Sequence, residues 1–379
     1  MSRRLVAVHP NVDLYGSDRM FLAAVQELPT DGDSVTTVVS GKGLLTDELD
    51  DRGIAYECLS FPVLRKQELS SPIKVALWTG RCASAALRLA VWLRVRRIHT
   101  VYVSTIICPV WALAARLAGC QLVVHLHESE AGMPALLRGA LLSQLRIAHV
   151  VIANSNTSAE WAANAGRTVR SRTTVVFNGV AEPVVRTEPE WSDEASQHVV
   201  IVGRLNERKG QHLAISVVAA LRADGLDVGL TIIGDTFPGY ECYERRLHQQ
   251  AEQLGVGRNV TFKGFITEPG PYLSRADLVM VPSSVESFGN AAVEAMLAGA
   301  PVLASNVQGL TETIIHGKTG ILVAVNDIDA FTQGARALLM DRPAARALAE
   351  RGRAEARRRF STPAYGAGLR QAMPRYPAP

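Results

Sequence analysis

The sequence has few cysteines. Its 379 residues include five, an odd number, and no two of them form a Cys-x-x-Cys pair. This pattern argues against the disulfide framework of a small secreted domain and against a thiolate zinc site. We therefore expect a reducing, cytoplasmic environment.

The sequence also lacks a long uninterrupted apolar run and a strong charge imbalance. Its net charge is +4 and 47% of its residues are hydrophobic, which is typical of a folded globular protein and gives no reason to expect a nucleic-acid partner. The most apolar stretch, 101–119, contains Pro109 and is interrupted by Arg116, so we expect a buried strand and a helix there rather than a membrane span. Only a four-residue apolar run precedes His9, which is too short for a signal peptide.

Short runs rich in Val, Ile and Leu alternate with longer helical patterns along the whole chain. This alternation predicts parallel sheets with helices on both faces. The expected strands lie within 5–8, 34–40, 54–60, 100–104, 121–127, 150–155, 173–178, 198–203, 228–234, 259–264, 278–283, 300–305 and 319–324.

One segment interrupts this rhythm. Residues 181–197 contain prolines and five acidic residues among few core-forming ones, which predicts a linker between two doubly wound α/β domains, 1–180 and 198–355. The remaining segment, 356–379, is expected to be helical and can cross back to the first domain in a two-domain protein. Nearer the middle of the chain, Thr157 and Glu160 have the spacing of a capping box, and Gly166 is a candidate helix stop.

The segment "VESFGNAAVEAM" follows a predicted strand and begins a helix. Glu286 lies in the loop, Gly289 allows a ligand close to the backbone, and Asn290 and Glu294 lie on one helical face. This arrangement suits a ligand with a phosphate between hydroxyl-bearing rings. The alternative is a surface helix with two solvated glutamates.

A second strand-to-helix turn carries positive charge. In "VIVGRLNERKGQH", Arg204 follows a strand, and Lys209 and Gly210 open a helix. Two cations beside a helix N-terminus predict a diphosphate site that needs no metal. The alternative is a pair of ordinary surface cations.

Together these segments resemble the retaining glycosyltransferases of family 4. The resemblance rests on "GRLNERKG", "IIGD", "VTFKGFI", "ESFGNAAVEAMLAGAPVLAS" and "GLTETIIHGKTGILV", which follow one another in family order, and Glu286 and Glu294 match the family's E-x7-E motif. It implies the GT-B fold, in which two Rossmann-like domains face each other across a cleft, with acceptor binding mostly by the first.

The first half of the chain resembles this family more loosely. His127 in "VVHLHES" stands where the family has a histidine near the reacting sugar, and Asn178 begins the family's Asn-Gly-Val. The family's early loop usually has two adjacent glycines, whereas this chain has only Gly16.

The resemblance implies a role for each matching residue. Arg204 and Lys209 would bind the donor diphosphate, Glu294 the ribose hydroxyls, and Glu286 and His127 the donor sugar. Of these, His127, Arg204, Lys209 and Glu286 are the candidate catalytic residues. The rest of the expected donor site consists of Gly16, Phe265, Ile266, Phe288, Gly289 and Asn290.

The implied reaction retains configuration at the anomeric carbon, and the leaving phosphate oxygen takes the acceptor's proton. A role for His127 as the base remains open. Two Asp-x-Asp sequences, at 31–33 and 327–329, look like turn and helix-cap residues. We therefore expect no metal and no cofactor. The resemblance further implies a UDP- or GDP-sugar as the donor and a glycan or lipid-linked molecule as the acceptor.

Residues 65–97 predict a helix with a basic and tryptophan-bearing face. Lys74, Trp78, Arg81, Ala85, Arg88 and Trp92 share this face, and Arg65, Lys66, Arg94, Arg96 and Arg97 add charge. Such a face suits an anionic membrane, for example the inner face of the plasma membrane. The alternative is a core helix whose Leu77, Leu87 and Val91 face the sheet.

Two other functions remain open. A nucleotide-sugar epimerase of the same architecture lacks this glutamate pair and its cationic partners, and an inactive nucleotide-sugar-binding scaffold would retain them. A dinucleotide oxidoreductase is disfavoured because no Gly-x-Gly-x-x-Gly follows the first strand.

Overall fold

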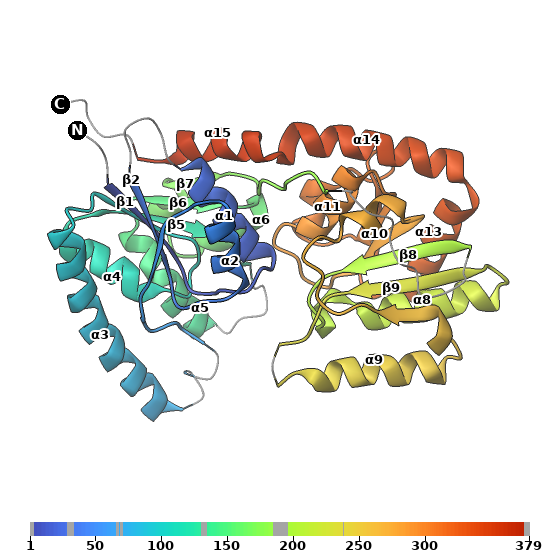
Figure 1. Cartoon of the computed structure of the whole chain (residues 1–379), viewed down its shortest axis with the longest axis horizontal. Coiled ribbons are helices and arrows are strands. Elements are labelled where there is room, and N and C mark those ends of the chain that lie inside the picture. The colour runs from blue at the N-terminus through green and yellow to red at the C-terminus, as the bar shows by residue number, and fades with distance from the viewer. Residues whose placement is uncertain are drawn as a thin grey trace. The chain divides into compact units, whose positions relative to one another are not determined.

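The computed structural model describes residues 4–28, 34–65, 68, 71–129, 135–184, 196–237 and 239–374. The chain divides into two compact units (Figure 1). The first comprises Met1–Gly179 together with Thr362–Pro379, and the second comprises Val180–Ser361.

The first unit is built on a parallel sheet whose strand order is β3-β2-β1-β4-β5-β6-β7. Its strands are β1 (Arg4–His9), β2 (Ser34–Val39), β3 (Tyr56–Cys58), β4 (Thr100–Val103), β5 (Gln121–Leu126), β6 (Val150–Ala153) and β7 (Thr173–Val175). Its helices are α1 (Gly16–Glu27), α2 (Leu44–Asp51), α3 (Pro72–Val95), α4 (Pro109–Ala118), α5 (Ala135–Leu142), η2 (Ser143–Ile147), α6 (Asn156–Ala163), α7 (Arg167–Arg170) and α15 (Thr362–Ala372).

The second unit has the parallel strand order β10-β9-β8-β11-β12-β13. Its strands are β8 (Gln197–Val202), β9 (Val228–Ile233), β10 (Val260–Phe262), β11 (Leu278–Val281), β12 (Val302–Ser305) and β13 (Ile321–Val323). Its helices are η3 (Glu207–Lys209), α8 (Gln211–Ala223), α9 (Glu241–Gln253), η4 (Gly257–Asn259), α10 (Gly270–Arg275), α11 (Asn290–Ala298), α12 (Leu310–Thr313), α13 (Ile328–Met340) and α14 (Arg342–Phe360).

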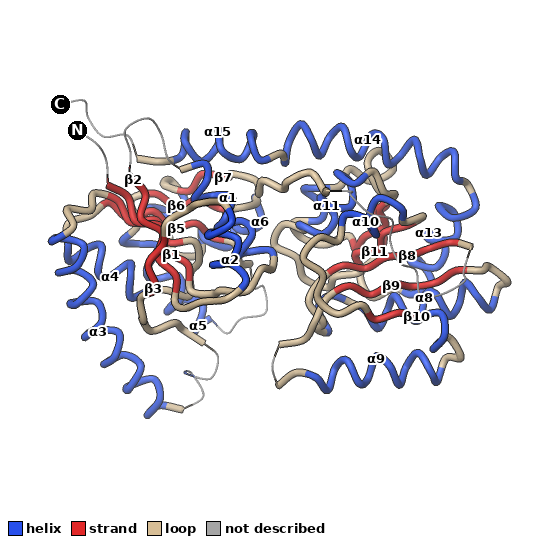
Figure 2. Tube along the Cα trace, viewed as in Figure 1, coloured by secondary structure: helices blue, strands red, loops and turns tan. Residues whose placement is uncertain are grey.

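Each unit is thus a Rossmann-like domain, and the predicted fold class is confirmed. Every apolar run predicted as a strand overlaps one. Helices lie on both faces of the sheets (Figure 2), which explains the near-continuous apolar strands: both faces are buried, as in Val6–Val8, whose side chains have no exposed surface.

The domain limits differ in position from the expected ones. The first unit ends at Gly179, and β8 already begins at Gln197, while 185–195 of the expected linker lie outside the described residues. The boundary expected at 355/356 falls inside α14, which continues unbroken to Phe360. Ser361 then adopts an extended conformation (φ −70°, ψ 153°), so the helix ends there.

The α6 cap is also different from the predicted one. Ser155, and not Thr157, is the N-cap: its hydroxyl accepts a hydrogen bond from the Ser158 backbone N–H at 3.0 Å. Helix α6 ends at Ala163, before Gly166. Gly166, with φ of +126°, is instead the N-cap residue of α7. Serine and threonine cap helices comparably well, so spacing alone did not choose between them.

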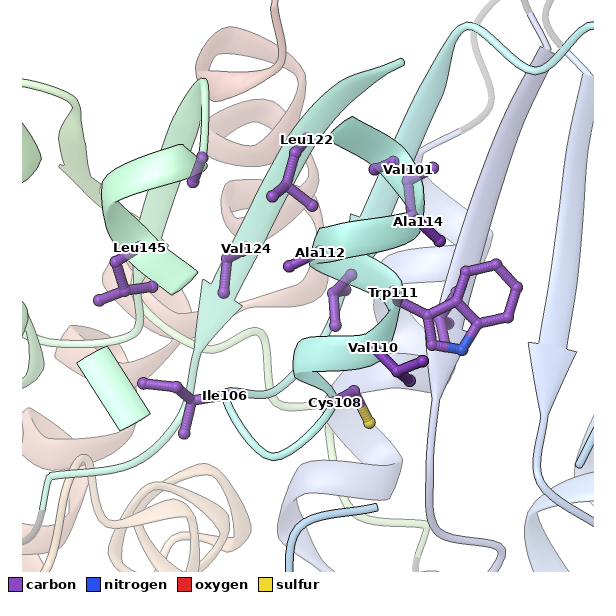
Figure 3. Packing of buried hydrophobic residues seen from close by; sticks show 14 of the residues in the cluster. Val101, Ile106, Cys108, Val110, Trp111, Ala112, Ala114, Leu122, Val124 and Leu145 are labelled. Atoms are coloured by element: carbon purple, nitrogen blue, oxygen red, sulfur yellow. The ribbon is translucent and has the colours of Figure 1, made fainter. Parts of the chain in front are cut away.

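The core of the first unit lies where α3 and α4 cover the sheet. Trp111 of α4 has no exposed surface, and Figure 3 shows it beside Val110 and Cys108. The rings of Phe61 and Trp92 meet Trp111 edge-to-face, with centroids 5.7 and 6.1 Å away.

Neither predicted face of α3 has the residues that we expected on it. Trp78 and Trp92 are partly buried and pack against the core, and Ala85 is buried, so they do not form an outer basic and tryptophan-bearing face. The opposite expectation also fails, because Leu77, Leu87 and Val91 are exposed. The residues that pack inward are mostly small (Cys82, Ala85, Ala86, Leu89, Ala90 and Leu93), and they let α3 lie close to α4.

Candidate functional site

In the second unit, the loop after β8 combines close backbone packing with two cations. Gly203 and Gly234 end neighbouring strands with φ of 152° and 143°, and a Cβ on Gly234 would lie 2.0 Å from the carbonyl oxygen of Gly203. Only glycine fits this approach of the two strand ends. Arg204 follows directly, and Lys209 ends the short helix η3.

Gly210 connects Lys209 to α8. Its φ is +73°, and a Cβ there would lie 2.3 Å from the carbonyl oxygen of Pro282, which follows β11. This contact holds the Lys209 turn against the loop that carries Glu286. Lys209 and Glu286, which the sequence predicted as site residues, are thereby brought together although they are 77 residues apart in the chain.

Lys209 and Glu286 form an ion pair. The Nζ atom of Lys209 lies 2.5 Å from Oε2 of Glu286, and their side chains are 27% and 13% exposed. A partly buried, hydrogen-bonded pair of this kind is held more firmly than a pair on the open surface. Both groups lie beyond the carboxyl ends of the adjacent strands β8 and β11, where parallel α/β sheets bind ligands.

Gln308, which was not among the predicted site residues, positions Glu286. The side-chain oxygen of Gln308 accepts a hydrogen bond from the Glu286 backbone N–H at 2.9 Å, and the Glu286 carbonyl accepts one from Gly309 N–H at 3.0 Å. A Cβ on Gly309 would meet the carbonyl oxygen of Ser287 at 2.3 Å. The only signal in the sequence was the glycine after Gln308, which is typical of a turn but does not point to Glu286.

Gly289 sets the direction of α11. It has φ of +103° and precedes Asn290, and a Cβ there would lie 2.6 Å from Cδ2 of Leu310. The Phe288 side chain is buried against Phe360, edge-to-face at 5.3 Å. Phe288 can therefore offer a ligand only its backbone, while the N–H groups at the start of α11 are suited to an anion. Glu294, one turn further on, is partly exposed.

The other expected donor residues lie along the same sheet edge. The guanidinium carbon of Arg204 is 3.3 Å from the ring centroid of Phe237, which is itself 49% exposed. Phe265 and Ile266 follow β10 and are partly exposed, and Gly234 N–H donates to the Gly264 carbonyl at 2.8 Å, which joins the loops after β9 and β10. Gly16 is the exception, since it begins α1 in the first unit.

The first unit has a polar cluster at the carboxyl ends of β1, β4 and β5. His9 Nε2 lies 2.7 Å from Oδ1 of Asp18, and His9 Nδ1 lies 2.5 Å from Oγ of Ser104. Asp18 Oδ2 accepts a hydrogen bond from Tyr15 N–H at 2.9 Å. All three side chains of the His9 network are buried, and none of them was among the predicted site residues.

His127 lies within this cluster. Burial lowers the pKa of His127 to about 3, with a further lowering by His9, while a hydrogen bond with Asn178 and the charge of Asp18 act in the opposite direction. The imidazole is therefore neutral at physiological pH. His127 and Asn178, which the sequence singled out separately, therefore lie close enough together for Asn178 to influence the His127 pKa.

Two neighbours of His127 add further polar groups. The His125 ring lies 4.1 Å from that of His127, and Nδ1 of His125 lies 2.6 Å from the Tyr102 hydroxyl. Glu128 accepts hydrogen bonds from the Thr105 hydroxyl and from His127 N–H, and burial raises its pKa despite these donors. Glu128 directly follows the histidine in the sequence but was not recognised as a candidate.

In the part of the chain that the structure describes, no group of three or more His, Cys, Asp or Glu side chains is arranged so that it could hold a metal ion. The Asp-x-Asp at 31–33 lies outside the described residues. The other, at 327–329, is a helix cap, since Asp327 accepts a hydrogen bond from Ala330 N–H at 2.9 Å.

Comparison with known proteins agrees with this division of the chain. Residues 16–182 match the family described as Glycosyltransferase Family 4, and residues 188–355 match Glycosyl transferases group 1. The chain belongs to the family 4 glycosyltransferases. The two matched regions correspond to the two Rossmann-like units, and the predicted resemblance to family 4 is confirmed.

This family 4 chain is similar in sequence to bacterial proteins that are named as glycosyltransferases. It is 30% identical over 212 residues to the lipopolysaccharide core biosynthesis glycosyltransferase LpsE of Rhizobium meliloti, covering 56% of this chain and 60% of that protein. It is 37% identical over 172 residues to a D-inositol 3-phosphate glycosyltransferase of Pseudarthrobacter chlorophenolicus, covering 43% of this chain and 39% of that protein. The matches thus span about half the length of these relatives.

A solved structure resembles the chain over nearly its whole length. The protein HepE of Anabaena, solved in complex with UDP and glucose, matches with a TM-score of 0.81 and 23% identity, over 97% of this chain and 98% of that one. At this identity the likeness shows the fold, which is GT-B.

Proposed function

We propose that this protein is a retaining, metal-independent glycosyltransferase that moves a hexose from a nucleoside diphosphate to a hydroxyl group of a glycan, glycolipid or lipid-linked acceptor. The observation that carries the proposal is the Lys209–Glu286 pair beside Arg204 and the start of α11, at the edge of the sheet where ligands bind. The relatives named above support it, since their names are those of glycosyltransferases.

The second unit would bind the donor. Arg204 and Lys209 supply two positive charges, and the α11 N-terminus supplies N–H groups, so a diphosphate is bound by side chains and backbone. As the bond to the sugar breaks, negative charge grows on the leaving phosphate. The same cations stabilise that charge most strongly in the transition state, which is the electrostatic contribution that accelerates such reactions.

The carboxylates would bind the rings on either side of the diphosphate. In our proposal Glu294 accepts hydrogen bonds from the ribose hydroxyls, and Glu286 accepts them from the donor sugar. Glu286 is already fixed by Lys209 and by the Gln308 contact to its backbone. A carboxylate fixed in this way loses little conformational freedom when the sugar binds.

His127 would bind a sugar hydroxyl rather than act as a base. An imidazole with a pKa of about 3 is a weak proton acceptor at neutral pH. In the proposed mechanism the acceptor's proton passes instead to the leaving phosphate oxygen on the same face of the sugar. The new glycosidic bond forms as the bond to phosphate breaks, so configuration is retained.

An assay with a panel of UDP-, GDP- and dTDP-sugars tests this proposal. The purified protein is incubated with each donor and with candidate acceptors, and nucleoside diphosphate release and glycoside formation are measured with and without EDTA. We expect release that depends on the acceptor and persists in EDTA, and an α-anomeric product from an α-linked donor.

Other outcomes would contradict the proposal. Interconversion of two donor sugars without glycoside formation indicates an epimerase, and donor binding without turnover indicates a scaffold. Loss of activity in EDTA that Mg²⁺ or Mn²⁺ restores would refute metal independence.

A further inference from the structure

The outer face of α3 carries large apolar side chains from one end of the helix to the other. Counting from Ile73 in steps of four and three residues gives one stripe on the side of the helix opposite the core. Its large members are well exposed: Ile73 is 74%, Leu77 65%, Leu87 61%, Val91 59% and Val95 76% exposed. The two small residues Gly80 and Ser84 fill the middle positions and are exposed as well. We call these seven residues the α3 stripe.

Such a stripe is unusual for a helix that already packs against its own domain. Cys82, Ala86, Leu89 and Leu93 face the core, so α3 is apolar on two opposite sides. Isolated exposed leucines are ordinary, but five large apolar side chains on one face mark a surface that contacts something apolar. In Figure 1, α3 lies beside α4 in the first unit with no further helix on its outer side.

Positive charge lines the stripe. Lys74, Arg81 and Arg88 recur every seven residues along one flank and are exposed, and Arg94 lies on the other flank. The sequence of α3 contains no Asp or Glu. Arg97, just after the helix, is exposed too.

This charge pattern distinguishes two occupants for the stripe. A second copy of α3 would bring basic flanks together without any acidic residue of the helix to pair with them, which is unfavourable. A bilayer with anionic headgroups offers both the apolar layer for the stripe and negative charge for its flanks. Among the described residues, no helix has the length and hydropathy of a membrane span.

We propose that the α3 stripe docks this protein on the surface of an anionic lipid bilayer, with α3 lying in the plane of the interface. Leucine, isoleucine and valine side chains enter the boundary between headgroups and acyl chains, and the basic flanks contact lipid phosphates. The inference deepens the proposed function and rests on it for one consequence only: an acceptor carried on a membrane lipid would be concentrated at the first unit.

Vesicle sedimentation tests the docking surface directly. The full chain is mixed with vesicles of phosphatidylcholine containing phosphatidylglycerol and, separately, with vesicles of phosphatidylcholine alone. We expect binding to the mixed vesicles that weakens with added salt, and at least about tenfold weaker binding to the neutral ones.

Matched variants assign the binding to the stripe. Leu77→Glu with Val91→Glu should weaken vesicle binding by at least about tenfold, because two charges replace apolar side chains at the interface. The control carries the same change at exposed apolar positions of the second unit, Leu254→Glu with Met340→Glu, which are 45% and 71% exposed. It should bind as the unaltered protein does.

Two results would overturn the inference. One is equal vesicle binding by the stripe variant and the control variant. The other is a dimer of the unaltered protein that dissociates in the stripe variant while neither protein binds vesicles, since the stripe would then be a contact between copies. Circular dichroism of both variants checks that they fold.

UDP binding is measured on the same preparations. None of the altered positions lies among the donor-binding residues, so loss of vesicle binding with unchanged UDP binding separates docking from donor recognition. A protein that binds vesicles through the stripe but turns over no donor would refute the proposed function and leave the docking surface standing.

Discussion

At the scale of single residues, the sequence pointed to the charged groups of the proposed donor site better than to the residues that position them. Arg204, Lys209 and Glu286 lie in the segments that follow β8 and β11, so their position at the sheet edge followed from the fold class. The role of Gln308 could not be predicted from the sequence, because only folding brings Gln308 to Glu286. The His9–Asp18 pair was missed for the same reason, since a buried histidine and aspartate nine residues apart resemble any others.

Lys209→Ala should weaken donor binding by about 10- to 100-fold, the usual effect of losing a charge-assisted hydrogen bond to phosphate. It also leaves Glu286, whose side chain is only 13% exposed, without its cation, so a carboxylate faces the donor's negative charge. Calorimetric titration with UDP measures the change. Lys318→Ala, at an exposed lysine, is the control, and equal affinity in the two variants would remove Lys209 from the donor site.

With His127→Asn, the free energy of unfolding should decrease less steeply as the pH falls. The pKa of His127 is about 3 in the folded chain and 6.5 in the unfolded one, so the unfolded state takes up the proton first as pH falls. The stabilisation by the neutral ring is complete above pH 6.5 and decreases between 6.5 and 3, at up to about 1.4 kcal/mol per pH unit. His125, whose pKa burial also lowers, remains in the variant, so the slope should decrease without vanishing.

Urea unfolding followed by tryptophan fluorescence reports this slope. Trp78, Trp92, Trp111 and Trp161 all lie in the first unit, as His127 does. His248→Asn, at an exposed histidine of α9, is the control. A variant whose stability falls with acid as steeply as that of the unaltered protein would show that His127 is already protonated or solvated in the folded state.

At the scale of elements, the strands were predictable and the faces of helices were not. Runs of β-branched residues locate strands because parallel strands are buried on both sides. For α3, the expectation that large apolar residues face inward gave the wrong side. Small residues let the helix approach α4 closely, and the larger Leu77, Leu87 and Val91 are exposed. The orientation of α3 depends on its packing against α4, and the periodicity of the α3 sequence carries no information about that packing.

The turn between η3 and α8 gives a prediction at this scale. Gly210→Ala should destabilise the second unit by about 3 kcal/mol or more, because it combines a left-handed backbone (φ +73°) with a Cβ 2.3 Å from the Pro282 carbonyl oxygen. It should also displace Lys209 and so weaken UDP binding.

The control Gly255→Ala separates the cost of a left-handed backbone from the cost of the steric clash expected in Gly210→Ala. Gly255 has nearly the same φ, +71°, but no atom would lie within 4 Å of a new Cβ. It should therefore cost only about 1 kcal/mol and leave UDP binding unchanged. Thermal unfolding of both variants is the measurement, and equal shifts in Tm would show that the loop relaxes around the new methyl group.

At the scale of the whole molecule, the chain returns to its first unit after completing the second. Ser361 closes the second unit through a bridge to Val180, and α15 then packs on α1. Arg370 Nη1 lies 2.7 Å from Glu27 Oε2, and Tyr365 is buried, with its hydroxyl donating to the Met20 carbonyl at 3.4 Å. Helix α15 is therefore part of the same folded unit as β1 and α1.

This connectivity predicts that a change near the C-terminus destabilises the unit at the N-terminus. Tyr365→Ala removes a side chain that is 1% exposed and touches the chain at Gly179, where an added Cβ would lie 2.4 Å from the Tyr365 Cβ. The cavity should cost about 3–5 kcal/mol. Hydrogen exchange should then speed up in peptides of β1, α1 and α15 and stay unchanged in β8 and α11. Phe331→Ala, at a fully buried residue of α13, should give the reverse pattern. Faster exchange in both units for both variants would mean that the chain unfolds as one cooperative body, because a cavity in either core would then lower the stability of the whole.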